Sequence, residues 1–201
     1  MHAPRPTARA SYLLPPASMS SAFFYGTLMH PRILTRVIGS AGAHLRIAPA
    51  VLLGYTRHKV RYADYPGIIP NTDDDDETCS VRGTLVTGLT PRDVQFLDTF
   101  EGSEYKRQKV AVHVLAAAVA LSDYTMPAAA PAPLPARAAL PAPGEAETYV
   151  YIDRGGLLPD VWDFAEFVAE NAWKWYDSHP DEDDGIAEVE RRRAAGTTAV
   201  I

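Results

Sequence analysis

The stretch "AFFYGTLMHP", residues 22–31, determines how the chain begins to fold. Its first four residues are apolar or aromatic and predict a short buried strand. Gly26 then interrupts the run, and Pro31 opens a segment whose apolar residues recur at helical spacing as far as Gly39. The sequence therefore predicts a strand, a tight turn and a helix. Two interpretations of the turn stay open: a plain junction, or a loop that holds a ligand.

The rest of the chain alternates between strand patterns and helix patterns. In the region 46–70 we expect two strands, with Gly54 near their connection and a second turn at Tyr65–Gly67. Further strands are predicted at 79–89, 104–121 and 148–152, and further helices at 90–100 and 158–176. Because most strands follow one another directly, we expect an α+β fold: a small mixed or antiparallel β-barrel with flanking α-helices.

Composition divides the chain into a folded part and three unusual segments. Residues 1–20 are rich in Pro, Ala and Ser and are expected to be a disordered tail. Residues 21–178 are expected to form one domain, which carries an Ala/Pro-rich insertion at about 126–145. The last segment, 179–201, is charged and is expected to fray, although its part from Ile186 to Arg193 has the pattern of a helix.

Charge and motif content exclude several functional classes. A net charge of −6 argues against nucleic acid as a partner, and no apolar run is long enough to span a membrane. The chain lacks a glycine-rich phosphate loop and paired histidines, so we expect no cofactor and no metal. Its one cysteine, Cys79, opens a strand and favours a buried thiol over a nucleophile. A single cysteine fits a cytoplasmic location, and the oligomeric state stays open.

The segment "LDTFEGSEYKR", residues 97–107, has an acid immediately before a glycine that ends a helix. A carboxylate there faces the negative end of the helix dipole. If Glu101 is also enclosed by the neighbouring aromatic residues, desolvation raises its pKa and makes it a candidate general base near neutral pH. The alternative is that Glu101 faces solvent and that Gly102 is only a helix cap.

Taken together in order, five segments resemble the gamma-glutamylcyclotransferase-like superfamily, and specifically its AIG2-like (GGACT-like) branch. The segments are "FFYGTLMHP" at 23–31, "LLGYTRHKV" with "YPGIIP" within 52–70, "VRGTLVTGL" at 81–89, "LDTFEGSEYKRQKVAV" at 97–112 and "WDFAEF" at 162–167. The resemblance covers roughly residues 21–176. The Ala/Pro-rich insertion, the aspartate run at 73–76 and both tails depart from the family pattern without touching these segments.

The resemblance implies a small barrel with a cavity at one end and a cofactor-independent acyl transfer. The turn Tyr25, Gly26, Thr27 and Leu28 would hold the α-amino and α-carboxylate groups of a small-molecule gamma-glutamyl substrate through its backbone. Glu101 would be the general base, and Tyr105 would lie near the same pocket. Arg107 is expected to form a structural ion pair. The products would be 5-oxoproline and a free amine or amino acid.

Two other functions stay open at this stage. The same barrel would serve as a non-catalytic binding module for a small amino-acid-like ligand or a peptide end. Alternatively, the Ala/Pro-rich insertion and the acidic tail would act as docking segments of an interaction protein. The identity of the gamma-glutamyl compound is not fixed by the sequence.

Overall fold

The structure is a computed structural model, and it describes residues 19–71, 79–126, 133–177 and 184–194. The expectations for residues 1–18, for the aspartate run at 73–76 and for residues 195–201 lie outside the described residues. The same is true of residues 127–132 of the Ala/Pro-rich insertion. The domain bounds at 21 and 178 therefore stay predictions. Among the helices of the described residues, none is both long and apolar enough to cross a membrane.

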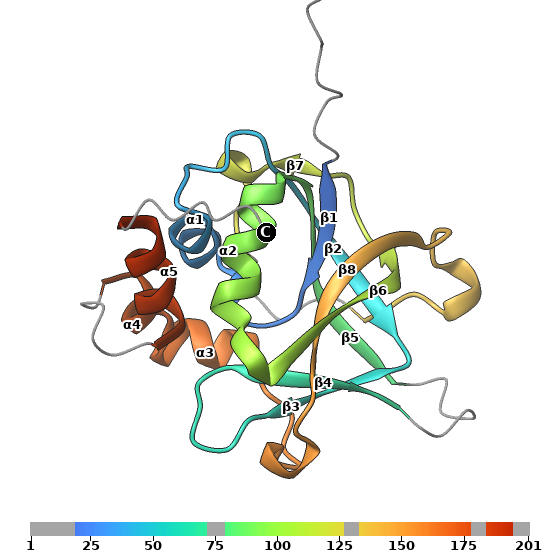
Figure 1. The fold of residues 1–201 in the computed structure, drawn as a ribbon. Coiled ribbons are helices and arrows are strands. Elements are labelled where there is room, and N and C mark those ends of the chain that lie inside the picture. The colour runs from blue at the N-terminus through green and yellow to red at the C-terminus, as the bar shows by residue number, and fades with distance from the viewer. Residues whose placement is uncertain (1–18, 72–78, 127–132, 178–183, 195–201) are drawn as a thin grey trace, which may run out of the picture.

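Five strands close into a barrel (Figure 1). They are β1 (Ser20–Phe24), β2 (Arg46–Leu53), β5 (Ser80–Leu89), β6 (Tyr105–Val114) and β8 (Gly144–Tyr151). The spatial order is β5-β1-β8-β6-β2, and a pairing of β2 with β5 closes the ring. Strands β1 and β8 run parallel, whereas the other neighbours in the ring are antiparallel. The predicted α+β class with a mixed barrel is confirmed.

The region 46–70 holds three strands, not the two that we predicted. After β2, the segments β3 (Tyr55–Lys59) and β4 (Pro66–Pro70) form a separate two-stranded sheet. The expected turn at Tyr65–Gly67 is wrong, because the chain reverses before it, where Tyr62 adopts a positive φ of 62°. Pro66 is tolerated in β4 because that strand pairs only with β3, so its missing N–H breaks no ladder on the other side.

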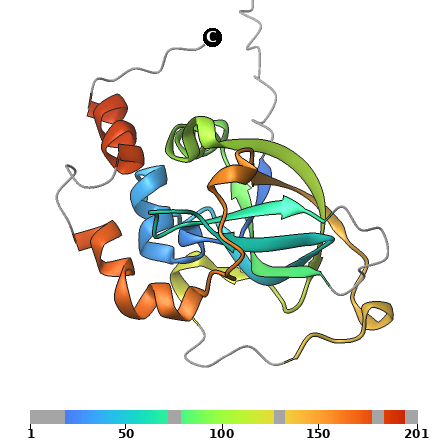
Figure 2. The same ribbon diagram turned by 90° about the horizontal axis from the view of Figure 1, so that it is seen from below.

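The helices gather on one side of the barrel (Figures 1 and 2). They are α1 (Pro31–Ile38), α2 (Pro91–Glu101), α3 (Phe164–Glu170), α4 (Ala172–Asp177) and α5 (Asp184–Ala194). The single helix predicted for 158–176 is wrong at its start and is broken at Asn171, which ends α3. Asparagine is a weak helix former and a common residue at helix ends, which accounts for the break.

Helix α5 is anchored to the body of the protein, so the described part of the charged C-terminal segment does not fray. Ile186 and Val189 are buried, and Glu190 pairs with Arg36 of α1 at 3.0 Å. The Arg193 guanidinium donates to the carbonyl of Val37 at 2.8 Å, near the end of α1. The helical pattern from Ile186 to Arg193 is therefore confirmed.

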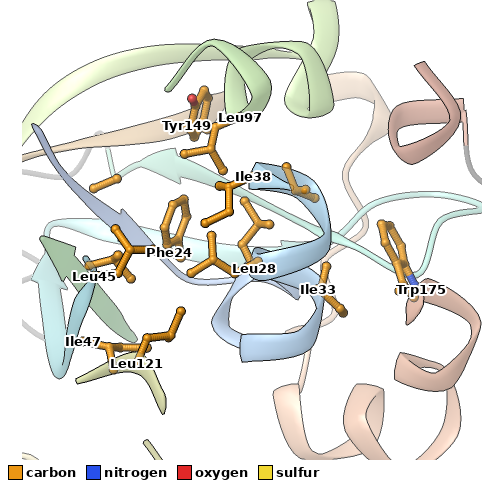
Figure 3. Packing of buried hydrophobic residues seen from close by; sticks show 14 of the residues in the cluster. Phe24, Leu28, Ile33, Ile38, Leu45, Ile47, Leu97, Leu121, Tyr149 and Trp175 are labelled. Carbon is orange, nitrogen blue, oxygen red and sulfur yellow. The ribbon is translucent and has the colours of Figure 1, made fainter. Parts of the chain in front are cut away.

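Alternation along β1 divides the core into two clusters. Phe23 and Tyr25 point into the barrel, among side chains such as Leu52 and Val112. Phe24 points the other way, into the layer between the barrel and the helices. Figure 3 shows Phe24 and Leu28 packed beside Ile38 in that layer. The strand thus fixes the start of the 25–28 turn from both sides of the sheet.

Candidate active site

A cavity of about 920 Å³ opens where the end of β1, the end of α2, the β3–β4 hairpin and α4 meet. All six residues that the sequence singled out line it: Tyr25, Gly26, Thr27, Leu28, Glu101 and Tyr105. The volume lies in the range that small-molecule sites occupy. Two segments far apart in the chain therefore meet at one hollow, as the sequence predicts for a ligand site.

The turn after β1 is held rigidly by the protein. The Tyr25 hydroxyl donates a 2.6 Å hydrogen bond to the carbonyl of Tyr149. Thr27 and Leu28 are buried and begin a short 3₁₀ turn (Thr27–Met29), in which the N–H of Met29 donates to the carbonyl of Gly26 at 3.0 Å. The first N–H groups of such a turn have no partner within it, so the backbone presents donors near its start.

Gly26 is needed for a reason that sequence reasoning did not identify. A Cβ at Gly26 would lie 2.9 Å from Cδ and Cγ of Pro66. That distance is shorter than an ordinary van der Waals contact, so a larger residue would displace the β4 strand from the turn. The glycine thus lets two walls of the cavity pack together.

Glu101 is the last residue of α2, and it is partly buried against the cavity. Among the described residues, its carboxyl group makes no hydrogen bond and no ion pair. Burial first, and the nearby Asp98 carboxylate second, raise its pKa to about 8. The interpretation of Glu101 as a plain solvent-facing residue does not fit this environment.

Asp98, one helical turn before Glu101, has two partners in the protein. One of its carboxylate oxygens accepts from the Tyr149 hydroxyl at 2.8 Å and lies 2.9 Å from Nε of Arg107. Arg107 also reaches Glu147 at 2.6 Å. The expected structural ion pair of Arg107 is thus present. It leaves Glu101 as the carboxyl group of this turn that faces the cavity without a protein partner.

Tyr25, Tyr105 and Tyr149 line the same cavity as Glu101. Burial is the main reason that the pKa values of Tyr25 and Tyr105 lie well above the ordinary value, and the charge of Glu101 contributes to both. Burial and the negative charge of Asp98 likewise raise the pKa of Tyr149. The Tyr105 hydroxyl donates to the carbonyl of Pro66 at 2.9 Å. These rings stay uncharged at neutral pH and form a firm, partly apolar wall.

Several cavity residues were missed by sequence reasoning: Tyr65, Tyr149, Lys174 and Trp175. Figure 3 shows the Tyr149 ring beside Leu97 of α2, with Trp175 placed apart on α4. Trp175 contacts Tyr65 and Phe100 edge to face, with centroids 6.3 and 6.0 Å apart. The spacing of the missed residues in the sequence matches ordinary strand and helix patterns. Nothing in the sequence therefore distinguished these residues from core residues.

The structure shows where Cys79 lies and how the potential metal ligands among the described residues are distributed. Cys79 is partly buried, and its sulfur accepts from the Asn71 side chain at 3.4 Å. It does not line the cavity. Within the described ranges, no three His, Cys, Asp or Glu side chains are grouped in a way that would hold a metal ion.

Comparison with known proteins shows the family of the chain that forms this cavity. Residues 22–158 match the model of the family described as gamma-glutamyl cyclotransferase, AIG2-like. The chain belongs to this family. The matched range contains the 25–28 turn, Glu101 and Tyr105, and it ends before α3 begins.

Curated relatives come from Arabidopsis thaliana. AIG2-like protein C is 33% identical over 90 residues, which cover 45% of this chain and 48% of that protein. AIG2-like protein D is 32% identical over 95 residues, which cover 47% and 57%. The chain spans about half the length of the curated relatives it matches.

Two solved structures share the fold. A solution structure from Arabidopsis thaliana has a TM-score of 0.51 at 23% identity, covering 80% of this chain and 79% of that one. The crystal structure of a yeast gamma glutamyl cyclotransferase specific to glutathione has a TM-score of 0.51 at 13% identity, covering 92% and 90%. At these identities the likeness concerns the fold alone.

Proposed function

We propose that this protein is a gamma-glutamyl cyclotransferase that converts a gamma-glutamyl compound into 5-oxoproline and a free amine or amino acid. Family membership supports this class of enzyme. The observation that carries the proposal is the Glu101 carboxyl group, which faces the cavity, has no partner among the described residues and has its pKa raised to about 8. An unpartnered carboxyl group with such a pKa is suited to acid–base work near neutral pH.

In the proposed reaction the substrate attacks itself. The backbone of the 25–28 turn binds the α-carboxylate, and the substrate folds so that its α-amine lies against its own γ-carbonyl carbon. The Glu101 carboxylate takes one proton from the α-ammonium group, and the freed lone pair forms the new C–N bond. The protonated Glu101 then donates to the departing nitrogen as the old C–N bond breaks. The ring nitrogen still carries one proton too many after the attack, and it gives that proton to the Glu101 carboxylate, from which the released amine takes it up. A five-membered lactam and a protonated amine result.

This chemistry needs little from the protein. Because nucleophile and electrophile share one molecule, holding the folded conformer draws on effective molarities of roughly 10⁵–10⁸ M in favourable cases. A positioned general base adds on the order of 10²–10⁴-fold. The rigid turn and the aromatic walls supply the first contribution, and Glu101 supplies the second.

The experiment measures 5-oxoproline by mass spectrometry after incubation with gamma-glutamyl amino acids, glutathione and gamma-glutamylamines. We expect Glu101→Gln to lower kcat/KM for the best substrate at least about 100-fold. Wild-type kcat/KM should rise with pH through about 8, because the ionised form of Glu101 is the base.

The matched control is Glu145→Gln, which makes the same chemical change in an exposed pair with Lys109 outside the cavity. This variant should keep the wild-type rate. Wild-type release of 5-oxoproline by Glu101→Gln would refute the assigned role. Tight binding of these compounds by the wild type with no 5-oxoproline formed would instead identify a binding module.

A further inference from the structure

The cavity contains an uneven set of charges. Its described lining residues include four carboxyl groups, and Lys174 is the basic side chain among them. Two of the carboxylates already have partners: Glu104 accepts from the Tyr65 hydroxyl at 2.9 Å, and Glu188 pairs with Arg192 at 2.6 Å. Any anionic group of a ligand that reaches this part of the cavity therefore meets Lys174 as its counter-charge.

The Lys174 ammonium group can donate a further hydrogen bond. Its Nζ donates to Oδ1 of Asn171 at 2.8 Å, which is a short bond to a neutral amide. Its distance to Oδ2 of Asp64 is 3.4 Å, which is long for a charged pair. An ammonium group has three donors, so at least one is available to a ligand. The side chains of Lys174 and Asp64 are 43% and 38% exposed, so a ligand can reach both.

A set of contacting aromatic rings connects the chain neighbours of Lys174 with those of Glu101. Next to Lys174 and Asp64 in sequence are Trp175 and Tyr65, whose rings contact each other edge to face. Trp175 in turn contacts Phe100, the residue before Glu101, and Tyr65 contacts Tyr105. Lys174 and the proposed base line the same cavity, on different helices.

We propose that Lys174 binds a carboxylate on the leaving half of the substrate, which makes gamma-glutamyl amino acids or short gamma-glutamyl peptides better ligands than simple gamma-glutamylamines. This inference rests on the proposed function for the position of the substrate. Glu101 and the 25–28 turn bind the γ-glutamyl end, so the leaving half extends past Tyr65 and Trp175. Lys174 comes from α4, which lies after the range that matches the family model.

The test is isothermal titration calorimetry on the Glu101→Gln protein, which removes turnover from the measurement. The two ligands are gamma-glutamyl-alanine and its C-terminal carboxamide, which differ only in the charge of interest. With Lys174 present, the carboxylate form should bind about five- to tenfold more tightly, as is usual for one charge-assisted hydrogen bond at a partly exposed site. Adding Lys174→Met should bring the ratio of the two affinities close to one.

Two further variants sharpen the test. Asp64→Asn removes the competing carboxylate, so it should increase the ratio. Lys59→Met removes the same charge from an exposed pair with Glu166 outside the cavity, so it should leave the ratio as it was. The proposal is overturned if Lys174→Met weakens both ligands equally, if the starting ratio is already one, or if neither ligand binds.

These outcomes are independent of catalysis. If the wild type releases no 5-oxoproline but the ratio depends on Lys174, the proposed function fails while the carboxylate site stands. If the wild type turns over both compounds equally and the ratio is one, the enzyme stands and the carboxylate site fails.

Discussion

The two ends of α2 place an acidic residue in opposite environments. At the start, Thr90 and Asp93 cap each other: Oδ2 of Asp93 accepts from the N–H of Thr90 at 2.8 Å and from Nε2 of His44, also at 2.8 Å. A negative charge there also matches the helix dipole. At the other end, Glu101 opposes the dipole and has no protein partner among the described residues.

This contrast distinguishes a carboxylate that stabilises the fold from a carboxyl group that is available to a ligand. A carboxylate that accepts several hydrogen bonds from the protein stabilises the fold and has less capacity left for a ligand. A carboxyl group that is desolvated and left unpaired costs stability, and such groups concentrate where proteins do chemistry. One helix of 11 residues therefore fixes the fold at its first turn and presents a reactive group at its last.

The largest expected effect on stability comes from a substitution at the start of α2, where the carboxylate of Asp93 has hydrogen-bond partners. Asp93→Ala should lower the free energy of unfolding by about 4 kcal/mol, because a buried carboxylate is removed and its three donors lose their acceptor. Urea denaturation at pH 7 measures the change. A loss below about 1 kcal/mol would mean that this end of α2 is not the stable one.

At the end of α2, Glu101 is expected to have a somewhat smaller effect on the free energy of unfolding, and this effect depends on pH. The folded pKa of Glu101, about 8, lies above its ordinary value of 4.5, so the folded state holds the proton more tightly than the unfolded state. The contribution of Glu101 to wild-type stability should therefore be fully present below about pH 4.5 and be lost as the pH rises through about 8. Each pKa unit corresponds to about 1.4 kcal/mol, and partial solvent access reduces the total to about 3 kcal/mol.

Glu101→Gln removes this titration. Its unfolding free energy should match that of the wild type at pH 4 and exceed it by about 3 kcal/mol at pH 9. Parallel urea titrations of the two proteins at both pH values test the difference. A gap that stays constant with pH would show that Glu101 titrates alike in the folded and unfolded states.

The parts of this molecule that the sequence predicted are those set by local chemistry. The buried strand at the start of the 22–31 stretch, the helix over 90–100 and its end at Gly102 each depend on a few neighbouring residues. The pairing of the 25–28 turn with Glu101 came from resemblance to a family, since no local pattern links segments so far apart.

The parts that it did not predict depend on how distant elements meet. Tyr149 reaches Asp98 only because β8 lies in the closed barrel beside α2, and its position in a strand is otherwise unremarkable. Lys174 meets Asp64 only because α3 ends at Asn171 and α4 turns back toward the β3–β4 hairpin. The close packing of Gly26 against Pro66 was not predicted for the same reason, because Pro66 lies far away in sequence.

The most direct test is a carbon-13 NMR titration of the Glu101 side-chain carboxyl group in the wild-type protein without ligand. The resonance is assigned by its absence from Glu101→Gln. The environment described above predicts a midpoint near pH 8. A midpoint near 4.5, the ordinary value for a glutamate, would contradict a desolvated, unpartnered carboxyl group and with it the proposed base.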